Sequence, residues 1–369
     1  MSAGDPVARL CGAVFDCLPR RDQRGTAELY VRTLLTAPGG RSLRHTARSA
    51  GHRDDGQRLN HFITAAPWDW RPVRAALAEQ VAAAVRPVAW AVRPATVARR
   101  GLQGVGVGHY VDHLRGRSVR AQRSVGLWLV TDHGDIPVGW RLVLPPSWLE
   151  APANRDRCAV PEGLVPAGTA RTALDCGLRG VGAAGPAADL PVVLDARQAH
   201  VPTAIAEFTA RRIPYLLRIA GTEPLLGTGG NAPAGRLGAP PARGERRRST
   251  FVSVLEDREG RRREIVRVAC RPTTGAPRLR PHTLLGEHTA RAHGTTAFWL
   301  TDLAGHPTPA LLDLARSLRP ATAAAVPDTG LYAYTGRSFP AWHRHTTLAS
   351  VAHAAAVLFR ARTGPTAIR

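Results

Sequence analysis

Arginine is the residue type with the most evident capacity to bind a ligand in this sequence. The chain has 50 lysine and arginine residues against 28 acids, a net charge of +22, and it contains no lysine, so every one of these cations is an arginine. A GC-rich genome would explain the choice of arginine over lysine, but not the excess over acids. Such an excess is typical of proteins that bind a polyanion, most often a nucleic acid. A solubility charge, or contact with a ribosome or a membrane surface, is the alternative.

Several arginine clusters are candidates for contacts with DNA phosphates. One cluster, in 41–58, lies on and between two short predicted helices and suits either a helix-turn-helix-like reader or a charged solvent face. Two triplets flank a predicted hairpin in 251–270 and suit either a DNA clamp or a solvated loop. The full set of candidates is Arg41, Arg44, Arg48, Arg53, Arg58, Arg93, Arg99, Arg100, Arg246, Arg247, Arg248, Arg261, Arg262, Arg263, Arg337 and Arg344.

Carboxylates are the side chains that would hold a hard divalent metal, because such ions prefer oxygen ligands. Asp195 ends the apolar segment PVVLD, where an isolated aspartate would more simply cap the following turn. His343 and His345 have no acid or cysteine nearby, so they suit DNA or structural contacts better than a metal site. The five cysteines contain no CxxC pair, which argues against zinc and disulfides and fits a reducing cytoplasm.

Helical spacing of apolar residues dominates about the first 85 residues. After residue 88 the pattern changes to that of a mixed sheet with helices. Residues 151–189 are expected to be loosely structured, and 221–244 to be a loop rich in glycine, proline and alanine. We expect helices over 6–18, 26–37, 42–50, 57–65, 70–85, 203–212, 311–318 and 348–360, and strands over 88–92, 104–111, 124–130, 137–144, 190–195, 214–219, 251–255, 264–270 and 297–303.

Five segments resemble, in the same order, segments of insertion-sequence DDE transposases of the insertion sequence 701 group. They include a Pro-Trp between two helices, the segment LPPSWLE, and a glycine-arginine and histidine-rich segment before a final helix. A further segment, PVAWAVRPATVARRG at 87–101, resembles the strand that delivers the first catalytic acid in such enzymes. The five segments are Arg58–Leu77, residues 104–117, Leu144–Glu150, Pro191–Ile219 and Gly330–Ser350.

The resemblance implies a ribonuclease-H-like core, in which three carboxylates hold two divalent ions for in-line displacement at phosphorus. Arg93 takes the place of the first acid, whereas Asp195 matches the second. The third acid, a glutamate, matches Arg319 or, with a short deletion, Thr322, and no glutamate follows Glu287 in the chain. Pro320 and Pro327 are also expected to break the helix that would carry it. Two of the three acids are therefore expected to be missing.

Three functions remain open on this basis. The first is a DNA-binding, catalytically inactive homologue whose former groove, lined by Arg93, Arg99 and Arg100, binds DNA without a cofactor, as a domesticated regulator, an accessory factor or a decaying element. The second is an active transposase that uses Mg²⁺ for DNA cleavage and strand transfer. The third is an RNA-binding or protein-assembly factor. For the second, the acids that could replace the lost ligands are Asp132, Asp135, Asp302, Asp313 and Asp328.

The resemblance and the patterns together predict an α/β protein with a ribonuclease-H-like mixed-sheet core. We expect a helical, DNA-binding domain over 1–86, a first part of the core over 87–220, a β-rich insertion over 221–296 and a C-terminal part of the core over 297–369. DNA is the expected partner, such as transposon ends or promoter DNA, and a homodimer is a further expectation. No apolar stretch of about 18 residues and no secretory signal is recognised, so we expect a cytoplasmic, nucleoid-associated protein.

Overall fold

The chain divides into two compact units in the computed structural model. Unit 1 comprises Met1–Val88, Arg93–Ala188 and Pro320–Arg369, and unit 2 comprises Ala89–Val92 and Asp189–Arg319. Each unit is described by itself. The structure describes residues 5–36, 55–101, 104–112, 116–150, 152–181, 187–241, 250–256, 262–273, 281–289, 297–318 and 329–363.

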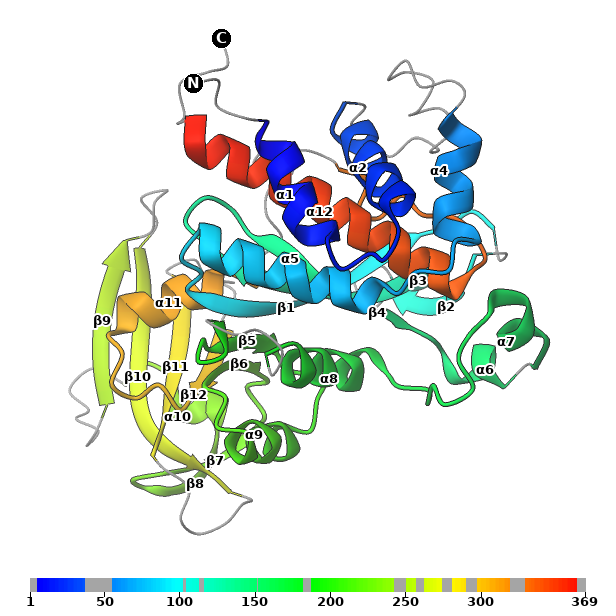
Figure 1. Ribbon diagram of the computed structural model, residues 1–369. Coiled ribbons are helices and arrows are strands. Elements are labelled where there is room, and N and C mark those ends of the chain that lie inside the picture. The colour runs from blue at the N-terminus through cyan, green and yellow to red at the C-terminus, as the bar shows by residue number, and fades with distance from the viewer. Residues whose placement is uncertain are drawn as a thin grey trace. The chain divides into compact units, whose positions relative to one another are not determined.

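A bundle of helices forms one part of unit 1 (Figure 1). The first four are α1 (Pro6–Phe15), α2 (Arg21–Thr36), α4 (Asp55–Thr64) and α5 (Trp70–Ala84). Each is apolar on one face only, as the sequence pattern predicts. Asp5 and Asp69 cap α1 and α5 by accepting a hydrogen bond from a main-chain N–H of the first turn. The predicted helix over 42–50 lies outside the described residues.

The fifth helix of the bundle, α12 (Phe339–Thr363), is contacted by α1, α2, α4 and α5 and also by strand β4. Its central residues, including Leu348, Val351 and Ala354, are completely buried. Because neighbours surround it, the helix needs no polar face, and its sequence shows almost no amphipathic pattern. It begins nine residues before the predicted start at Leu348, since its first turns carry proline and histidines instead of aliphatic residues.

The strands of unit 1 centre on the long strand β3 (Arg117–Val130). Its first half pairs with β2 (Val107–Asp112) and its second half with β4 (Ile136–Val143), both antiparallel. Strand β1 (Ala89–Ala98) lies on the other side of β3, with its residues from Arg93 onward in unit 1. The prediction that this strand ends at Val92 is wrong, since it continues through Arg93 and Pro94. Pro94 is exposed, which is where a strand tolerates proline.

Residues 151–189 are more ordered than predicted. They contain α7 (Pro152–Cys158) and the longer helix α8 (Thr169–Val181), which follow the short helix α6 (Pro146–Leu149). Helix α8 buries Ala173, Leu174 and Leu178 and packs on β3 and β4. The prediction of a loose segment fails because this apolar face is short and its flanks are rich in glycine, alanine and proline.

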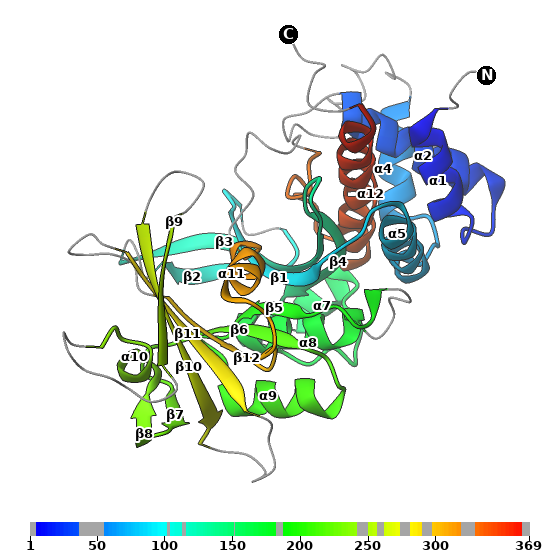
Figure 2. The ribbon, with the colours of Figure 1, turned by 90° about the vertical axis from the view of Figure 1, so that its left-hand side faces the viewer.

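Unit 2 is built on a mixed sheet (Figure 2). The start of β1, β5 (Val192–Asp195) and β6 (Tyr215–Ile219) are parallel, with α9 (Val201–Ala210) connecting β5 and β6. Antiparallel strands follow in the order β12 (Ala297–Thr301), β11 (His282–Thr289), β10 (Arg262–Pro272) and β9 (Thr250–Glu256). Helix α11 (Thr308–Arg316) and α9 lie on opposite sides of these strands.

The predicted hairpin of β9 and β10 is confirmed by its register, whereas β11 was not predicted. The alternation that marks a strand is interrupted in β11 by Gly286 and by polar residues. The predicted loop over 221–244 contains β7 (Pro224–Gly227), β8 (Gly230–Pro233) and the single-turn helix α10 (Ala234–Leu237), within its described part. Strand β7 pairs with the end of β10, so these short elements extend the sheet of unit 2.

Both units thus have a mixed α/β composition with buried apolar cores. In the part of the chain that the structure describes, no helix is both long and apolar enough to cross a membrane.

Candidate functional site

Arg93 is buried inside unit 1, with 9% of its surface exposed. Its guanidinium forms an ion pair with Asp135, which directly precedes Ile136, the first residue of β4. The guanidinium also lies over the indole ring of Trp128, 5.0 Å from the ring centroid. A buried cation needs such a counter-charge, because its desolvation would otherwise be very costly. The position predicted to match the first acid therefore holds an internal ion pair.

The residue Asp135 is held at its main chain as well as at its carboxylate. Nε2–H of His353, on α12, donates a hydrogen bond of 3.0 Å to the carbonyl oxygen of Asp135. The imidazole also contacts Trp128 edge-on, with 5.7 Å between ring centroids. Burial lowers the pKa of His353 to about 4, and the nearby charges of Arg360 and Arg93 act in the same direction. His353 is therefore neutral at pH 7, and Arg93 supplies the positive charge of this cluster.

Asp195 ends strand β5 in unit 2, as predicted. Its carboxylate accepts hydrogen bonds from the main-chain N–H of Arg197 at 3.2 Å and from that residue's guanidinium, at 2.9 Å from Nε to Oδ1 and 2.7 Å from Nη2 to Oδ2. The hydrogen bonds that the guanidinium donates to Asp195 raise the pKa of Arg197 above its ordinary value. A bidentate arginine occupies the oxygens that a metal would need, so a metal ion at Asp195 would have to displace Arg197.

Asp302 lies at the opposite end of β6 from Asp195. Asp302 accepts a hydrogen bond from the main-chain N–H of Tyr215, at the start of β6. In the register of β5 and β6, Asp195 instead lies opposite Arg218, near the end of β6. The rise of a strand places these two ends about 10 Å apart. Asp302 is therefore too far along the sheet to share a metal ion with Asp195.

Of the other acids considered as replacements, those that the structure describes are engaged elsewhere or exposed. Asp313, on α11, forms an ion pair with Arg316 on the same helix. Asp132 is exposed and Asp135 is paired with Arg93. Asp328 lies outside the described residues, as do Arg319 and Thr322. Across the described ranges of the chain, no three histidine, cysteine, aspartate or glutamate side chains are grouped as a metal site would need. The acids that the structure describes therefore do not fit a two-metal centre.

Comparison with protein families identifies the relationship that the sequence suggested. A family model described as DDE superfamily endonuclease matches residues 13–277. The chain belongs to this family. A search of curated proteins found no match. The matched span includes Arg93 and Asp195 and ends before Arg319 and Thr322. The predicted relationship to DDE transposases is confirmed at the level of the family, and the mixed α/β fold fits it.

Membership of the DDE superfamily endonucleases makes DNA the expected partner, so the positions of the predicted phosphate contacts matter. Besides Arg93, three of these arginines are engaged within the protein. Arg99 donates three hydrogen bonds, of 2.8–2.9 Å, to Gln122 and to the carbonyl oxygens of Tyr332 and Tyr334. Arg344 donates to the carbonyl oxygens of Ile63 and Trp68, and so connects α12 to the α4–α5 segment.

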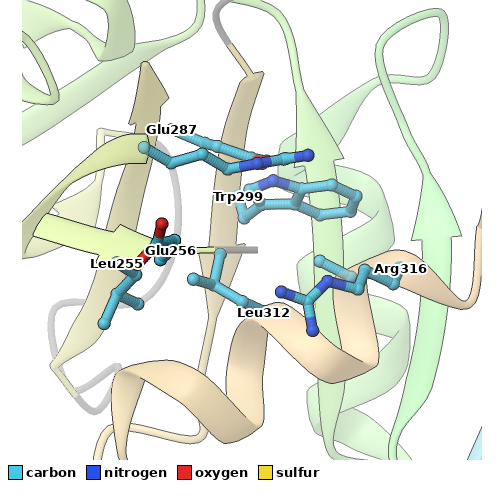
Figure 3. Close-up of a pocket in the computed structure, with 8 residues that line it drawn as sticks. Leu255, Glu256, Glu287, Trp299, Leu312 and Arg316 are labelled. Carbon is cyan, nitrogen blue, oxygen red and sulfur yellow. The ribbon is translucent and has the colours of Figure 1, made fainter. Parts of the chain in front are cut away.

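Arg263 is the third engaged arginine. It forms an ion pair with Glu287 across β10 and β11, and both side chains are only 10% exposed. A cavity of about 20 Å³, the room of one water molecule, lies beside this pair and is lined also by Trp299 and by Leu312 of α11 (Figure 3). Such a space is far too small for a nucleotide, so it is a packing feature of unit 2 and not a substrate site.

The other described candidates are exposed. Arg58 donates to the hydroxyl oxygen of Thr26 at 2.8 Å and lies 3.7 Å from Asp55, but remains accessible on α4. Arg100, Arg262 and Arg337 are also exposed. These four side chains lie on different elements and remain predicted DNA contacts. Arg41, Arg44, Arg48, Arg53, Arg246, Arg247, Arg248 and Arg261 lie outside the described residues.

Sequence reasoning did not find the partners that define these sites. Arg197 follows Asp195 by two residues, so a strand-end acid followed closely by a cation was a signal that could have been used. Asp135 was considered only as a replacement ligand, whereas the structure pairs it with Arg93. Trp128 belongs to an ordinary apolar strand pattern, which gives no sign of its contact with a guanidinium.

Proposed function

We propose that this protein binds DNA with a transposase-like architecture and does not catalyse DNA cleavage. The observation that carries the proposal is the buried ion pair of Arg93 with Asp135, at the position that matches the first catalytic acid. Two-metal phosphoryl transfer needs clustered carboxylates that attract divalent ions. A guanidinium at this position repels such ions and also neutralises the nearest carboxylate.

The state of Asp195 supports the same proposal. Its carboxylate is bound by Arg197, and Asp302 lies at the other end of β6. One carboxylate alone does not hold two metal ions. The loss of the third acid at Arg319 or Thr322 rests on the sequence alone. Membership of the insertion sequence 701 group, a ribonuclease-H-like core and the four predicted domain ranges belong to this proposal.

DNA binding rests on the family and on charge. A net charge of +22 favours a polyanion, and Arg58, Arg100, Arg262 and Arg337 are the described members of the predicted set of phosphate contacts that are exposed. Phosphate contacts fix position but carry no sequence information. We therefore propose DNA binding in the role of a regulator, an accessory factor or the product of a decaying element, with localisation at the nucleoid.

The proposal is tested with end-labelled DNA that carries the terminal repeats of the element, incubated with the protein in Mg²⁺, in Mn²⁺ and in EDTA. We expect a gel shift of equal strength in all three and no cleavage product. Metal-dependent cleavage that Asp195→Asn abolishes, and that the exposed control Asp313→Asn preserves, would contradict inactivity and establish the active transposase instead.

The active transposase is kept as the second candidate because the family is described as endonucleases. It would require a rearrangement that releases Asp135 from Arg93 and Asp195 from Arg197.

Competition of the gel shift by RNA of the same length tests the remaining alternative, an RNA-binding function. Stronger competition by RNA than by DNA would favour an RNA-binding function.

A further inference from the structure

Strand β9 is an exposed edge of the unit 2 sheet. It pairs with β10 on one side, and β10 is flanked on its other side by β11. No strand within the described ranges pairs with the outer side of β9, which is the outermost strand of this sheet in Figure 1. In an antiparallel strand alternate residues direct their main-chain N–H and C=O groups outward. The edge therefore presents a row of hydrogen-bonding groups.

The side chains of this edge are unusually apolar for an exposed strand. Phe251, Val252 and Val254 are 69%, 42% and 63% exposed. Proteins normally protect such an edge with charge, proline or a bulge. The segment Thr250–Glu256, TFVSVLE, has no proline, no glycine and no cation, in a chain with 50 arginines. Its regular pairing with β10 also shows no register shift. The edge lacks these protections, which indicates that it is used for pairing.

We propose that β9 pairs antiparallel with β9 of a second copy of this chain, so that the two sheets become continuous across a two-fold axis at Ser253. In this register Val252 faces Val254 of the other copy, Phe251 faces Leu255, and Thr250 faces Glu256. Every apolar side chain thereby meets an apolar side chain and no like charges are opposed. The strand is self-complementary, as the isologous contact of a two-fold dimer requires.

Self-complementarity is the reason for assigning a second copy instead of a different peptide. The composition also disfavours nucleic acid as the occupant, because β9 carries one carboxylate and no cation. A seven-residue strand pair buries less surface than a standard stable interface. Two copies with a net charge of +22 also repel each other. The dimer is therefore weak, and we expect it to strengthen with added salt, which screens that repulsion.

A pair of double variants tests the register. In V252R/V254R, each arginine faces an arginine of the other copy. In V252E/V254R, each glutamate faces an arginine. Both variants remove the same two valines, so a general loss of apolar surface affects them alike. Sedimentation velocity over a range of protein concentrations should show a dimer for the parent. We expect V252R/V254R to raise the dissociation constant at least about tenfold and V252E/V254R to recover most of that loss. The exposed control Val165→Arg should behave as the parent.

A cysteine at the two-fold axis gives a second test. Facing residues of antiparallel strands have Cβ atoms about 5 Å apart, so Ser253→Cys should form a disulfide between copies under mild oxidation. Thr250→Cys is the matched control, because its counterpart in the other copy would be about 20 Å away. Both are made in Cys17→Ser, since Cys17 is the exposed one of the five native cysteines and the other four are buried.

The outcomes separate clearly. A covalent dimer with S253C and not with T250C, together with charge-dependent rescue in V252E/V254R, supports the proposal. A monomer at all concentrations and salt levels overturns it, as does a dimer that both double variants leave unchanged. Equal cross-linking by both cysteines overturns the register. None of these outcomes bears on DNA binding, which the gel shift measures separately.

Discussion

The side chain of Arg93 has a structural role. Its guanidinium neutralises Asp135 and covers the ring of Trp128, while His353 holds the main chain of Asp135 from α12. A catalytic carboxylate at residue 93 would instead place two acids side by side. The cluster therefore depends on the cation for its stability, which is a property that mutation can measure.

Arg93→Ala should leave the half-buried Asp135 carboxylate without its counter-charge. Breaking one side of a buried ion pair costs about 3 kcal/mol of unfolding free energy. Urea unfolding followed by circular dichroism gives this quantity. Arg100→Ala, at an exposed position on the same segment, should change it by less than about 0.5 kcal/mol. Equal stability of the two variants would mean that the ion pair contributes nothing.

Three buried histidines distinguish helix α12 at the level of elements. His345 accepts a hydrogen bond from the hydroxyl of Tyr30 and donates to the carbonyl of Gly330, both at 2.8 Å. His343 accepts a hydrogen bond from Arg74. Burial lowers the pKa of the Arg74 guanidinium to about 9. Burial lowers the pKa of His345 and His353 to about 4, and that of His343 well below its ordinary value. All three are therefore neutral where they pack.

These histidines make the protein less stable in acid. His345 and His353 bind a proton near pH 6.5 in the unfolded chain but only near pH 4 in the folded one, and the folded-state pKa of His343 is lowered as well. The unfolded state therefore gains protons first, and stability falls as pH drops below about 6.5. His345 and His353 each contribute up to roughly 3 kcal/mol over this window. Urea midpoints from pH 7.5 to pH 5 should show the decline. His353→Gln should make it shallower, whereas the exposed His61→Gln should leave it unchanged.

Gly286 shows a close approach between two elements of unit 2. A Cβ atom at this position of β11 would lie 2.1 Å from the carbonyl oxygen of Gly238, directly after α10. Because the added Cβ would meet a main-chain atom, no change of side-chain rotamer could relieve the clash. Gly286→Ala should lower the unfolding free energy by about 2 kcal/mol or more. Gly305→Ala meets no atom within 4 Å and is the matched control; if both substitutions were equally mild, α10 would have to be free to move.

How far the sequence predicts the fold depends on how clean each pattern is. The β9–β10 hairpin and β5 have unbroken alternation or a compact apolar run, and both were predicted. Strand β11 was not predicted, because the glycine at its centre interrupts the apolar pattern. Gly286 is in close contact with Gly238, which lies 48 positions earlier in the chain, and no local sequence pattern reveals such a contact. Likewise, Asp195 could be found at a strand end, but the partner of Arg93 is 42 residues away in the chain. Long-range pairs of this kind require the structure.

For the whole molecule, charge governs the interaction with DNA. If Arg58, Arg100, Arg262 and Arg337 each neutralise one phosphate, affinity should fall by about 100-fold between 50 and 200 mM salt. Fluorescence anisotropy with a labelled duplex measures the dependence. Arg100→Gln should reduce the slope of log K against log salt by about 1. A slope that does not change would remove Arg100 from the set of contacts. The internally engaged Arg344 is unsuitable for this test, because its loss would also disturb α4 and α5.

Helix α12 belongs to the same unit as α1, α2, α4 and α5, yet all of unit 2 precedes it in the chain. A ribosome adds roughly 5–20 residues each second, so about 10–50 s pass between the synthesis of α5 and that of α12. During this time the apolar faces of the early helices lack the surface that finally covers them, whereas unit 2 already has all its strands. The nascent chain is thus exposed to chaperones and proteases at its beginning for longer than at its middle, and a premature stop anywhere before Phe339 leaves that exposure permanent.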